Sequence, residues 1–313
     1  MTSKLYDSNF LSISAQVDFF SYVKVITRFA PSPTGQLHLG HAYAARVAYE
    51  YARERGGEML LRFEDIDFTR VRDEYYQQIE NDLHWLGINW PHQPWRQSTR
   101  GEIYRDALQQ LINAAVVYPC FCTRKEIVRE LAAMANAPQQ GDLLEGPLYP
   151  RTCRMISLDE REQRMAEGMS YAWRLDAEKA RMMCGALFFT DLNHGLISVD
   201  HTLLGDVVIA RKDIGASYHL AVVCDDAAQQ VTHVTRGQDL LAATHVHCML
   251  QSLLQLPQPT YIHHALVYDV EGKRLAKRHD ALSLKKMRDD GMSPADIFSL
   301  LEVYAKSESA WVD

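Results

Sequence analysis

Two histidines three residues apart, His38 and His41, follow a proline-rich turn near the start of the chain. The surrounding stretch, residues 28–41, reads RFAPSPTGQLHLGH. If a helix begins at this point, both rings lie in its first turn, where unpaired N–H groups and a partial positive charge suit a phosphate. Gly40 between them allows a flat purine or a backbone to approach closely. The spacing therefore predicts a nucleotide site at a helix N-terminus.

The flanking residues predict the elements that hold this turn. The β-branched run of residues 23–27 is typical of a buried strand, and apolar side chains recur at helical spacing from Leu39 to Arg55. Gly56 and Gly57 then end the helix, and residues 59–63 (MLLRF) form a second apolar strand. Strand, helix and strand in this order predict a right-handed unit with two parallel strands.

Two charged residues fall at the carboxyl ends of these strands, where ligands bind in open α/β sheets. Arg28 ends the first strand and Glu64 follows the second. An arginine can bind a carboxylate, and a glutamate can bind an ammonium group, so the pair suits an amino acid. Alone, such residues are also common on surfaces, and only their place beside the histidines favours a site.

Six cysteines are present, at positions 120, 122, 153, 184, 224 and 248. The first twenty residues lack the apolar segment of a secretory signal, so we expect reduced thiols and favour metal binding over disulfides. Cys120, Cys122 and Cys153 offer three ligands for zinc, and a closed tetrahedral site needs a fourth. Tyr149, four residues before Cys153, is the candidate through its phenolate oxygen. From spacing alone, three buried free cysteines are an equal alternative.

Composition limits the class of protein. The 313 residues suggest about two domains, with 47% hydrophobic and 23% charged residues typical of a globular protein. No apolar run approaches the length of a membrane-spanning helix, so we expect no membrane partner and a cytoplasmic location. The net charge of −7 argues against a broad cationic surface for non-specific nucleic-acid binding, although a local basic patch can still hold RNA.

The second half of the chain repeats the pattern of strands and helices. Residues 205–211 are expected to form a strand that returns to the main sheet, and residues 216–226 a helix. A further strand, residues 231–235, ends at Arg236, so Tyr218 and Arg236 are expected at the same crevice as Arg28. After residue 281, only two short helical pieces are expected.

Taken together, these motifs resemble the class I aminoacyl-tRNA synthetases, in the glutamyl and glutaminyl branch. The resemblance covers residues 25–300. It implies an α/β fold with a Rossmann-type parallel nucleotide-binding sheet, split by a zinc-bearing acceptor-binding insertion and followed by a short helical C-terminal region. The implied parts are an N-terminal extension (1–22), two catalytic halves (23–117 and 205–270), the insertion (118–204) and a C-terminal region with a lysine loop (271–313).

The resemblance also implies roles for individual residues. It assigns glutamate binding to Arg28, Phe29, Ala30, Pro31, Ser32, Glu64, Tyr218 and Arg236. It assigns Mg-ATP binding to His38, Gly40, His41 and Lys277, of which the two histidines and the lysine are catalytic. Lys277 lies in EGKRLAKR, a loose match to the mobile KMSKS loop that closes over ATP. The resemblance also favours one structural zinc, on Cys120, Cys122, Tyr149 and Cys153.

The acceptor is the least constrained feature. A glutamyl core with no room for an anticodon-reading domain resembles the members that attach glutamate to queuosine in aspartate tRNA, and we expect a monomer. A truncated glutamyl-tRNA synthetase that charges the 3′ end of tRNA is the nearest alternative. The others are a small nucleotidylyltransferase with an HxGH motif and a non-catalytic RNA-binding paralogue.

Overall fold

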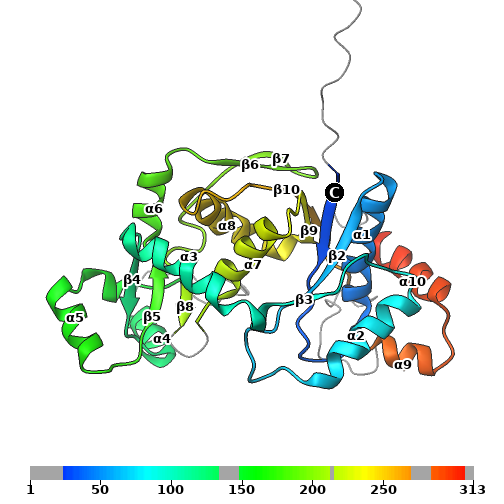
Figure 1. Ribbon diagram of the computed structural model, residues 1–313, viewed down its shortest axis with the longest axis horizontal. Helices are drawn as coiled ribbons and strands as arrows, with labels where there is room; N and C mark the ends of the chain where they lie inside the picture. Colours follow the sequence, from blue (N-terminus) through cyan, green and yellow to red (C-terminus); the bar gives the residue numbers. More distant parts are fainter. Residues whose placement is uncertain (1–23, 134–147, 212–214, 269–282, 307–313) are drawn as a thin grey trace, which may run out of the picture.

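The computed structural model describes residues 24–133, 148–211, 215–268 and 283–306 (Figure 1). Parallel strands at the centre of the molecule carry helices on both sides, and a smaller sheet lies at the far end from the C-terminal helices. Within the described residues, every helix is too short or too polar to cross a lipid bilayer.

The centre consists of two hydrogen-bonded groups of strands. The first is parallel, in the order β1-β2-β3, and the second has the order β7-β6-β10-β9, in which only β7 is antiparallel. The two groups meet where the backbone N–H of Thr232 donates to the carbonyl oxygen of Ile26 over 2.9 Å. The strands are β1 (Ile26–Phe29), β2 (Glu58–Phe63), β3 (Trp95–Arg96), β6 (Phe188–Asp191), β7 (Gly195–Ser198), β9 (His233–Gly237) and β10 (Thr260–His264).

Helix α1 (Leu39–Glu54) connects β1 to β2 and confirms the expected strand–helix–strand unit. Its buried face is mostly alanine, which lets the helix lie close to the sheet: Leu39, Ala42, Ala45, Ala48 and Ala52. The return to β2 requires Gly57, because a Cβ there would lie 2.1 Å from the carbonyl oxygen of Val25.

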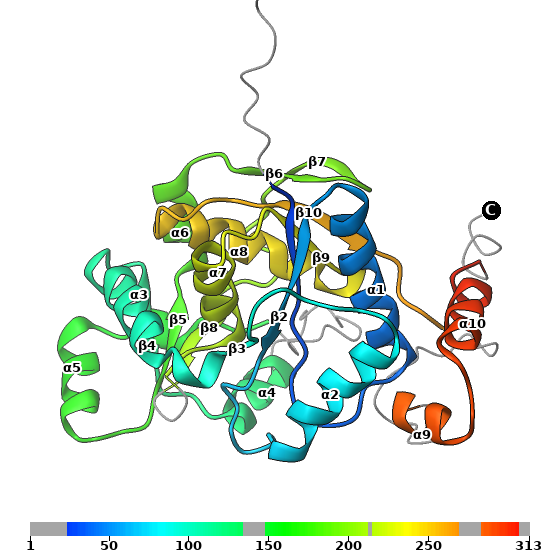
Figure 2. The same ribbon diagram turned by 45° about the vertical axis from the view of Figure 1, so that its right-hand side comes forward.

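Four helices bury the core cluster with the most residues among those the structure describes (Figure 2). Leu220, Val223, Val246 and Leu250 are at most 2% exposed within it. These helices are α3 (Gly101–Asn113), α6 (Ala177–Cys184), α7 (Tyr218–Ala228) and α8 (Leu241–Leu253). Their packing fixes α7, which carries several side chains of the candidate site.

A third, antiparallel sheet contains β4 (Val117–Cys120), β5 (Ala172–Leu175) and β8 (Val208–Arg211) in that order. It corrects the expectation that residues 205–211 return to the main sheet, because β8 pairs with β5 instead. A short apolar run identifies a strand but not its partner. The helices beside this sheet are α4 (Arg124–Ala133) and α5 (Leu158–Ala166).

The C-terminal helices α9 (Leu284–Asp289) and α10 (Pro294–Lys306) pack against α1 and α2 (Asp73–Trp85). Leu284 and Ile297 are fully buried in the same core as Leu37 and Leu39. Ser283 forms a β-bridge with His38, and the N–H of Leu284 donates to the carbonyl oxygen of Leu37 over 2.8 Å. The chain therefore returns to the start of α1 after β10.

Candidate active site

The first turn of α1 holds its two histidines in a fixed arrangement. His38 is the N-cap, and its Nδ1 accepts the backbone N–H of Gly40 over 3.1 Å. The Nδ1 of His41 accepts the N–H of His38 over 3.3 Å, and the ring centroids lie 3.8 Å apart. Because both Nδ1 atoms accept hydrogen bonds, the ring proton of each neutral imidazole is on Nε2. Each ring therefore has a hydrogen-bond donor at Nε2.

A cavity of about 1230 Å³ lies between the central strands and the third sheet. Ser32, Glu64 and Tyr218 line one end, and Cys120, Cys122 and Tyr149 line the other. Segments that are far apart in the sequence therefore line one cavity, in agreement with the crevice predicted at the ends of the strands.

Glu64 occupies the cavity end nearest the central strands, with 17% of its side chain exposed. Burial raises its pKa to about 7, although the neighbouring Arg62 and Arg28 act in the opposite direction. The Nη2 of Arg62 lies 4.0 Å from Oε1 of Glu64. A carboxyl group with this pKa changes its charge near neutral pH, so its charge depends on what else enters the cavity.

Behind Glu64, one carboxylate joins two buried arginines. Oδ1 of Asp226 lies 3.1 Å from Nε of Arg28 and 2.8 Å from Nη2 of Arg62. Arg28 also donates to the carbonyl oxygen of Thr235 over 3.0 Å. Burial alone would raise the pKa of Asp226, but Arg28 and Arg62 outweigh it and lower that pKa. Asp226 is therefore ionised and balances part of the arginine charge.

Arg236 lies in β9 and is buried beside Tyr218, the first residue of α7. Its Nη1 donates to the hydroxyl oxygen of Tyr218 over 3.4 Å, and its Nε donates to Nε2 of His263 over 3.1 Å. The sequence predicts both residues at the crevice. In the structure Tyr218 lines the cavity, and Arg236 contacts it from the protein interior.

Three thiols and a phenol converge at the other end of the cavity. The sulfur atoms of Cys120, Cys122 and Cys153 lie within 4.8 Å of one another, and the Cys122 sulfur lies 3.5 Å from the hydroxyl oxygen of Tyr149. Around a tetrahedral zinc with Zn–S bonds of 2.3 Å, sulfur atoms lie about 3.8 Å apart, so the donors fit that ion. Hydrogen bonds from the Cys120 thiol and then from Tyr149 lower the pKa of Cys153, which favours a thiolate there.

The structure distributes the predicted site residues unevenly. Ser32, Glu64 and Tyr218 line the cavity, whereas Phe29 is 7% exposed and packs in the apolar core. The carbonyl oxygen of Pro31 accepts the N–H of Glu64 over 3.1 Å, so the turn at Ala30 lies beside Glu64. Lys277 lies outside the described residues.

Sequence reasoning missed four buried polar residues: Arg62, Asp191, Asp226 and His263. Only Arg62 carries a local signal, since a charged residue in the apolar run of β2 must be paired inside the protein. The others contact residues from distant elements, and nothing in their neighbours along the chain indicates it.

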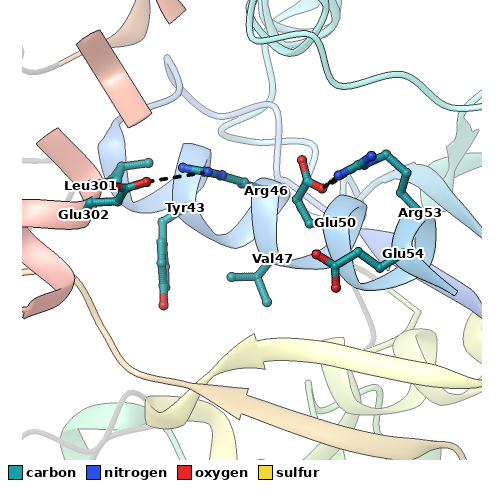
Figure 3. A pocket seen from close by; sticks show the side chains of 8 residues that line it. All are labelled: Tyr43, Arg46, Val47, Glu50, Arg53, Glu54, Leu301 and Glu302. Carbon is teal, nitrogen blue, oxygen red and sulfur yellow. Dashed lines mark hydrogen bonds and ion pairs between the residues drawn. The ribbon is translucent and has the colours of Figure 1, made fainter. Parts of the chain in front are cut away.

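A second groove, of about 490 Å³, lies between α1 and α10 (Figure 3). Arg46 points toward Glu302, 3.9 Å away, and Arg53 pairs with Glu50. Both arginines of this groove pair with glutamates, and Glu54 adds a further negative charge. Within the described residues, the groove therefore offers no converging positive charge for a phosphate or a carboxylate.

Comparison with known proteins agrees with this geometry. Residues 24–309 match the family model of the catalytic domain of class I tRNA synthetases of the E and Q type. This chain belongs to that family. A glutamyl-Q tRNA(Asp) synthetase of Rhodobacter capsulatus is 48% identical over 283 residues, which cover 88% of this chain and 99% of that protein. A glutamate–tRNA ligase of Aquifex aeolicus is 37% identical over a match that covers 89% of this chain and 56% of that ligase.

A solved structure is also similar: a glutamate tRNA ligase from Elizabethkingia meningosepticum in complex with its amino acid, with a TM-score of 0.67 and 28% identity. The match covers 86% of this chain and 53% of that one. This chain therefore spans about half the length of the glutamate–tRNA ligases that it matches. Family membership excludes the nucleotidylyltransferase alternative, and it confirms the resemblance predicted from the motifs.

Proposed function

We propose that this protein activates L-glutamate with ATP to glutamyl-adenylate and transfers the glutamate to queuosine in aspartate tRNA. One observation supports the activation step: Glu64 and Tyr218, from distant segments, line one end of a single cavity, and the buried Arg236 donates to the Tyr218 hydroxyl behind it. An acid faces the substrate ammonium, and Arg28 and Arg236 compensate its two carboxylates. The relatives named glutamyl-Q tRNA(Asp) synthetase support the acceptor.

In the proposed reaction, the protein positions glutamate and ATP against each other and forms no covalent bond to either. An oxygen of the glutamate α-carboxylate attacks the α-phosphorus of ATP, the new P–O bond forms, and pyrophosphate leaves with the electrons of the broken bond. The Nε2–H groups of His38 and His41 donate to the phosphate oxygens, where negative charge grows. A hydroxyl of the RNA then attacks the acyl carbon, and AMP leaves.

Lys277 is proposed to add a cation to the same phosphates. It stands six positions before Ser283, whose backbone pairs with His38. Six extended residues span about 20 Å, so the chain length allows Lys277 to reach the start of α1. The proposed zinc ligands are Cys120, Cys122, Tyr149 and Cys153, and the ion would stabilise the fold of this region without entering the reaction.

The histidines are tested by His41→Ala, measured as glutamate-dependent exchange of pyrophosphate into ATP. Loss of a preorganised donor to a developing charge reduces rates about 100- to 1000-fold, and we expect that loss in a folded protein. The melting temperature falls by only about 2–4 °C, because His41 also accepts the N–H of His38. His84→Ala, a surface histidine on α2, is the matched control and keeps full exchange. Undiminished exchange by His41→Ala removes this residue from the mechanism.

The acceptor is tested with labelled glutamate and three RNAs: aspartate tRNA with queuosine, the same tRNA without it, and glutamate tRNA. Labelling of the first alone supports the proposal. Labelling of glutamate tRNA instead establishes a synthetase that charges the 3′ end. A protein that binds these RNAs but shows no glutamate-dependent exchange is the non-catalytic paralogue.

A further inference from the structure

Arg236 is buried among neutral hydrogen-bond partners. The side chain is 5% exposed, and its guanidinium contacts Nε2 of His263, Nδ1 of His247 and the hydroxyls of Tyr218 and Thr244. Among the described residues, no ion pair within 4.0 Å joins a carboxylate to this arginine, in contrast to Arg28 with its direct bond to Asp226. The charge of Arg236 is therefore less compensated than that of Arg28.

His263, on β10, lies between Arg236 and the carboxylate of Asp191 and contacts both. Its Nδ1 lies 2.6 Å from Oδ2 of Asp191, at the end of β6, and its backbone N–H donates to the same oxygen over 3.0 Å. An ionised Asp191 holds the ring proton on Nδ1, so Nε2 keeps its lone pair and faces Nε of Arg236 over 3.1 Å. Burial and the neighbouring arginine lower the pKa of His263 to about 4, so the ring is neutral at physiological pH.

We propose that Asp191 and His263 are positioning residues for Arg236, orienting its guanidinium through an uncharged acceptor so that its positive charge remains available to a substrate carboxylate. A carboxylate bonded directly to Arg236 would hold it equally firmly but would compete with the substrate for its charge. This inference rests on the proposed role of Arg236 in glutamate binding.

A purely structural role is the alternative that the test must separate. Asp191 also organises the turn after β6, since its Oδ1 accepts the N–H groups of Asn193 and His194 and lies 2.8 Å from Nδ1 of His194. Loss of stability alone therefore does not support the proposal. The informative quantity is the KM for glutamate, compared with the KM for ATP.

The first test compares His263→Gln with His263→Asn in the glutamate-dependent pyrophosphate exchange assay. The longer amide can place an acceptor oxygen where Nε2 lies, whereas the shorter one reaches only the position of Nδ1. Leaving a buried donor of Arg236 unpaired weakens binding roughly 10- to 100-fold. We expect His263→Asn to raise the KM for glutamate by that factor and to leave the KM for ATP unchanged. His263→Gln stays within about threefold of the wild type, by the same principle.

The second test places Asp191→Asn in the wild-type and His263→Gln backgrounds. If the asparagine oxygen accepts the two turn N–H groups, its amide donates to Nδ1 of His263 and moves the ring proton to Nε2, toward Arg236. Asp191→Asn then raises the KM for glutamate in the wild-type background but not in the His263→Gln background. The melting temperature falls in both backgrounds, since the backbone N–H of residue 263 loses its acceptor, Oδ2 of Asp191, in each.

His233→Gln, a histidine on β9 that contacts Tyr51 and Thr232, is the matched control and leaves both KM values unchanged. An unchanged KM for glutamate in His263→Asn, or equal KM effects of Asp191→Asn in both backgrounds, overturns the positioning role. Absence of glutamate-dependent exchange in the wild type instead overturns the proposed function, so the two failures are distinguishable.

Discussion

The two ends of the large cavity balance charge in different ways. At the Glu64 end, the protein supplies both signs itself, with Asp226 between Arg28 and Arg62. At the thiol end, sulfur and oxygen donors converge within hydrogen-bond distance, and they suit a metal ion as partner. The charges at the first end are thus paired within the protein, whereas the second end is where the proposed zinc would add stability.

Metal removal is the strongest test of this difference. Structural zinc contributes on the order of 10 kcal/mol to folding in small zinc domains, so we expect chelation to lower the melting temperature steeply. We expect elemental analysis to find about one zinc ion per chain in the wild type and none in Cys153→Ser. Cys184→Ser, which alters a half-buried thiol outside the cluster, should keep it. If wild-type protein incubated with zinc retains less than about a tenth of a zinc ion per chain, the proposed zinc site is wrong.

Breaking the charge balance at the other end is the next largest effect. Asp226→Ala leaves Arg28 and Arg62 buried without their shared carboxylate, which costs about 3–5 kcal/mol of unfolding free energy. Asp289→Ala, which removes an exposed ion pair with Lys285, costs at most about 1 kcal/mol and is the control. Urea unfolding measures both values. A loss below about 1 kcal/mol for Asp226→Ala would show that this end is not held by its internal pairs.

Glu64 provides the smallest but most specific test. Its pKa of about 7 in the folded protein lies above the ordinary value of 4.5, so the folded state keeps the proton while the unfolded chain releases it. Stability therefore falls as pH rises from 4.5 to 7 and is constant above. Glu64→Gln removes this cost, and at 1.36 kcal/mol per pKa unit it should gain about 3 kcal/mol above pH 8 and nothing at pH 4.

The same substitution should abolish the fall in the KM for glutamate that we expect in the wild type as pH rises through 7. Asp67→Asn is the control. A hydrogen bond from Thr69 lowers the pKa of the Asp67 carboxyl, so the folded state favours its charged form, and replacing this carboxyl brings no gain in stability. A pH-independent difference in stability between Glu64→Gln and the wild type would contradict the raised pKa.

The thiol end could be predicted from the sequence because its signals are local. Cys120 and Cys122 are two residues apart, and Tyr149 and Cys153 are four apart, so only one long-range contact had to be inferred. The same holds for α1, whose alanine-rich face and glycine stop lie within one segment. In both cases the spacing of residues along the chain corresponds directly to a distance in space.

The charged end could be predicted only in part. Glu64 and Arg28 could be predicted because each lies at the carboxyl end of a strand, but Asp226 lies near the end of α7, where its partners depend on how that helix packs. The same limit explains β8, whose pattern identified a strand without its sheet. Asp191 and His263 belong to strands that pair side by side, although many residues separate them in sequence. Topology, rather than any local pattern, brings these groups together.

The most direct test of the central claim is a crystal structure with a non-hydrolysable glutamyl-adenylate analogue. The account predicts that the ligand ammonium lies at Glu64, that a carboxylate lies at Arg236, and that the adenosine phosphate lies at the first turn of α1, near His38 and His41. An analogue bound elsewhere, for example in the groove beside Arg46, with the cavity at Glu64 empty, would contradict it.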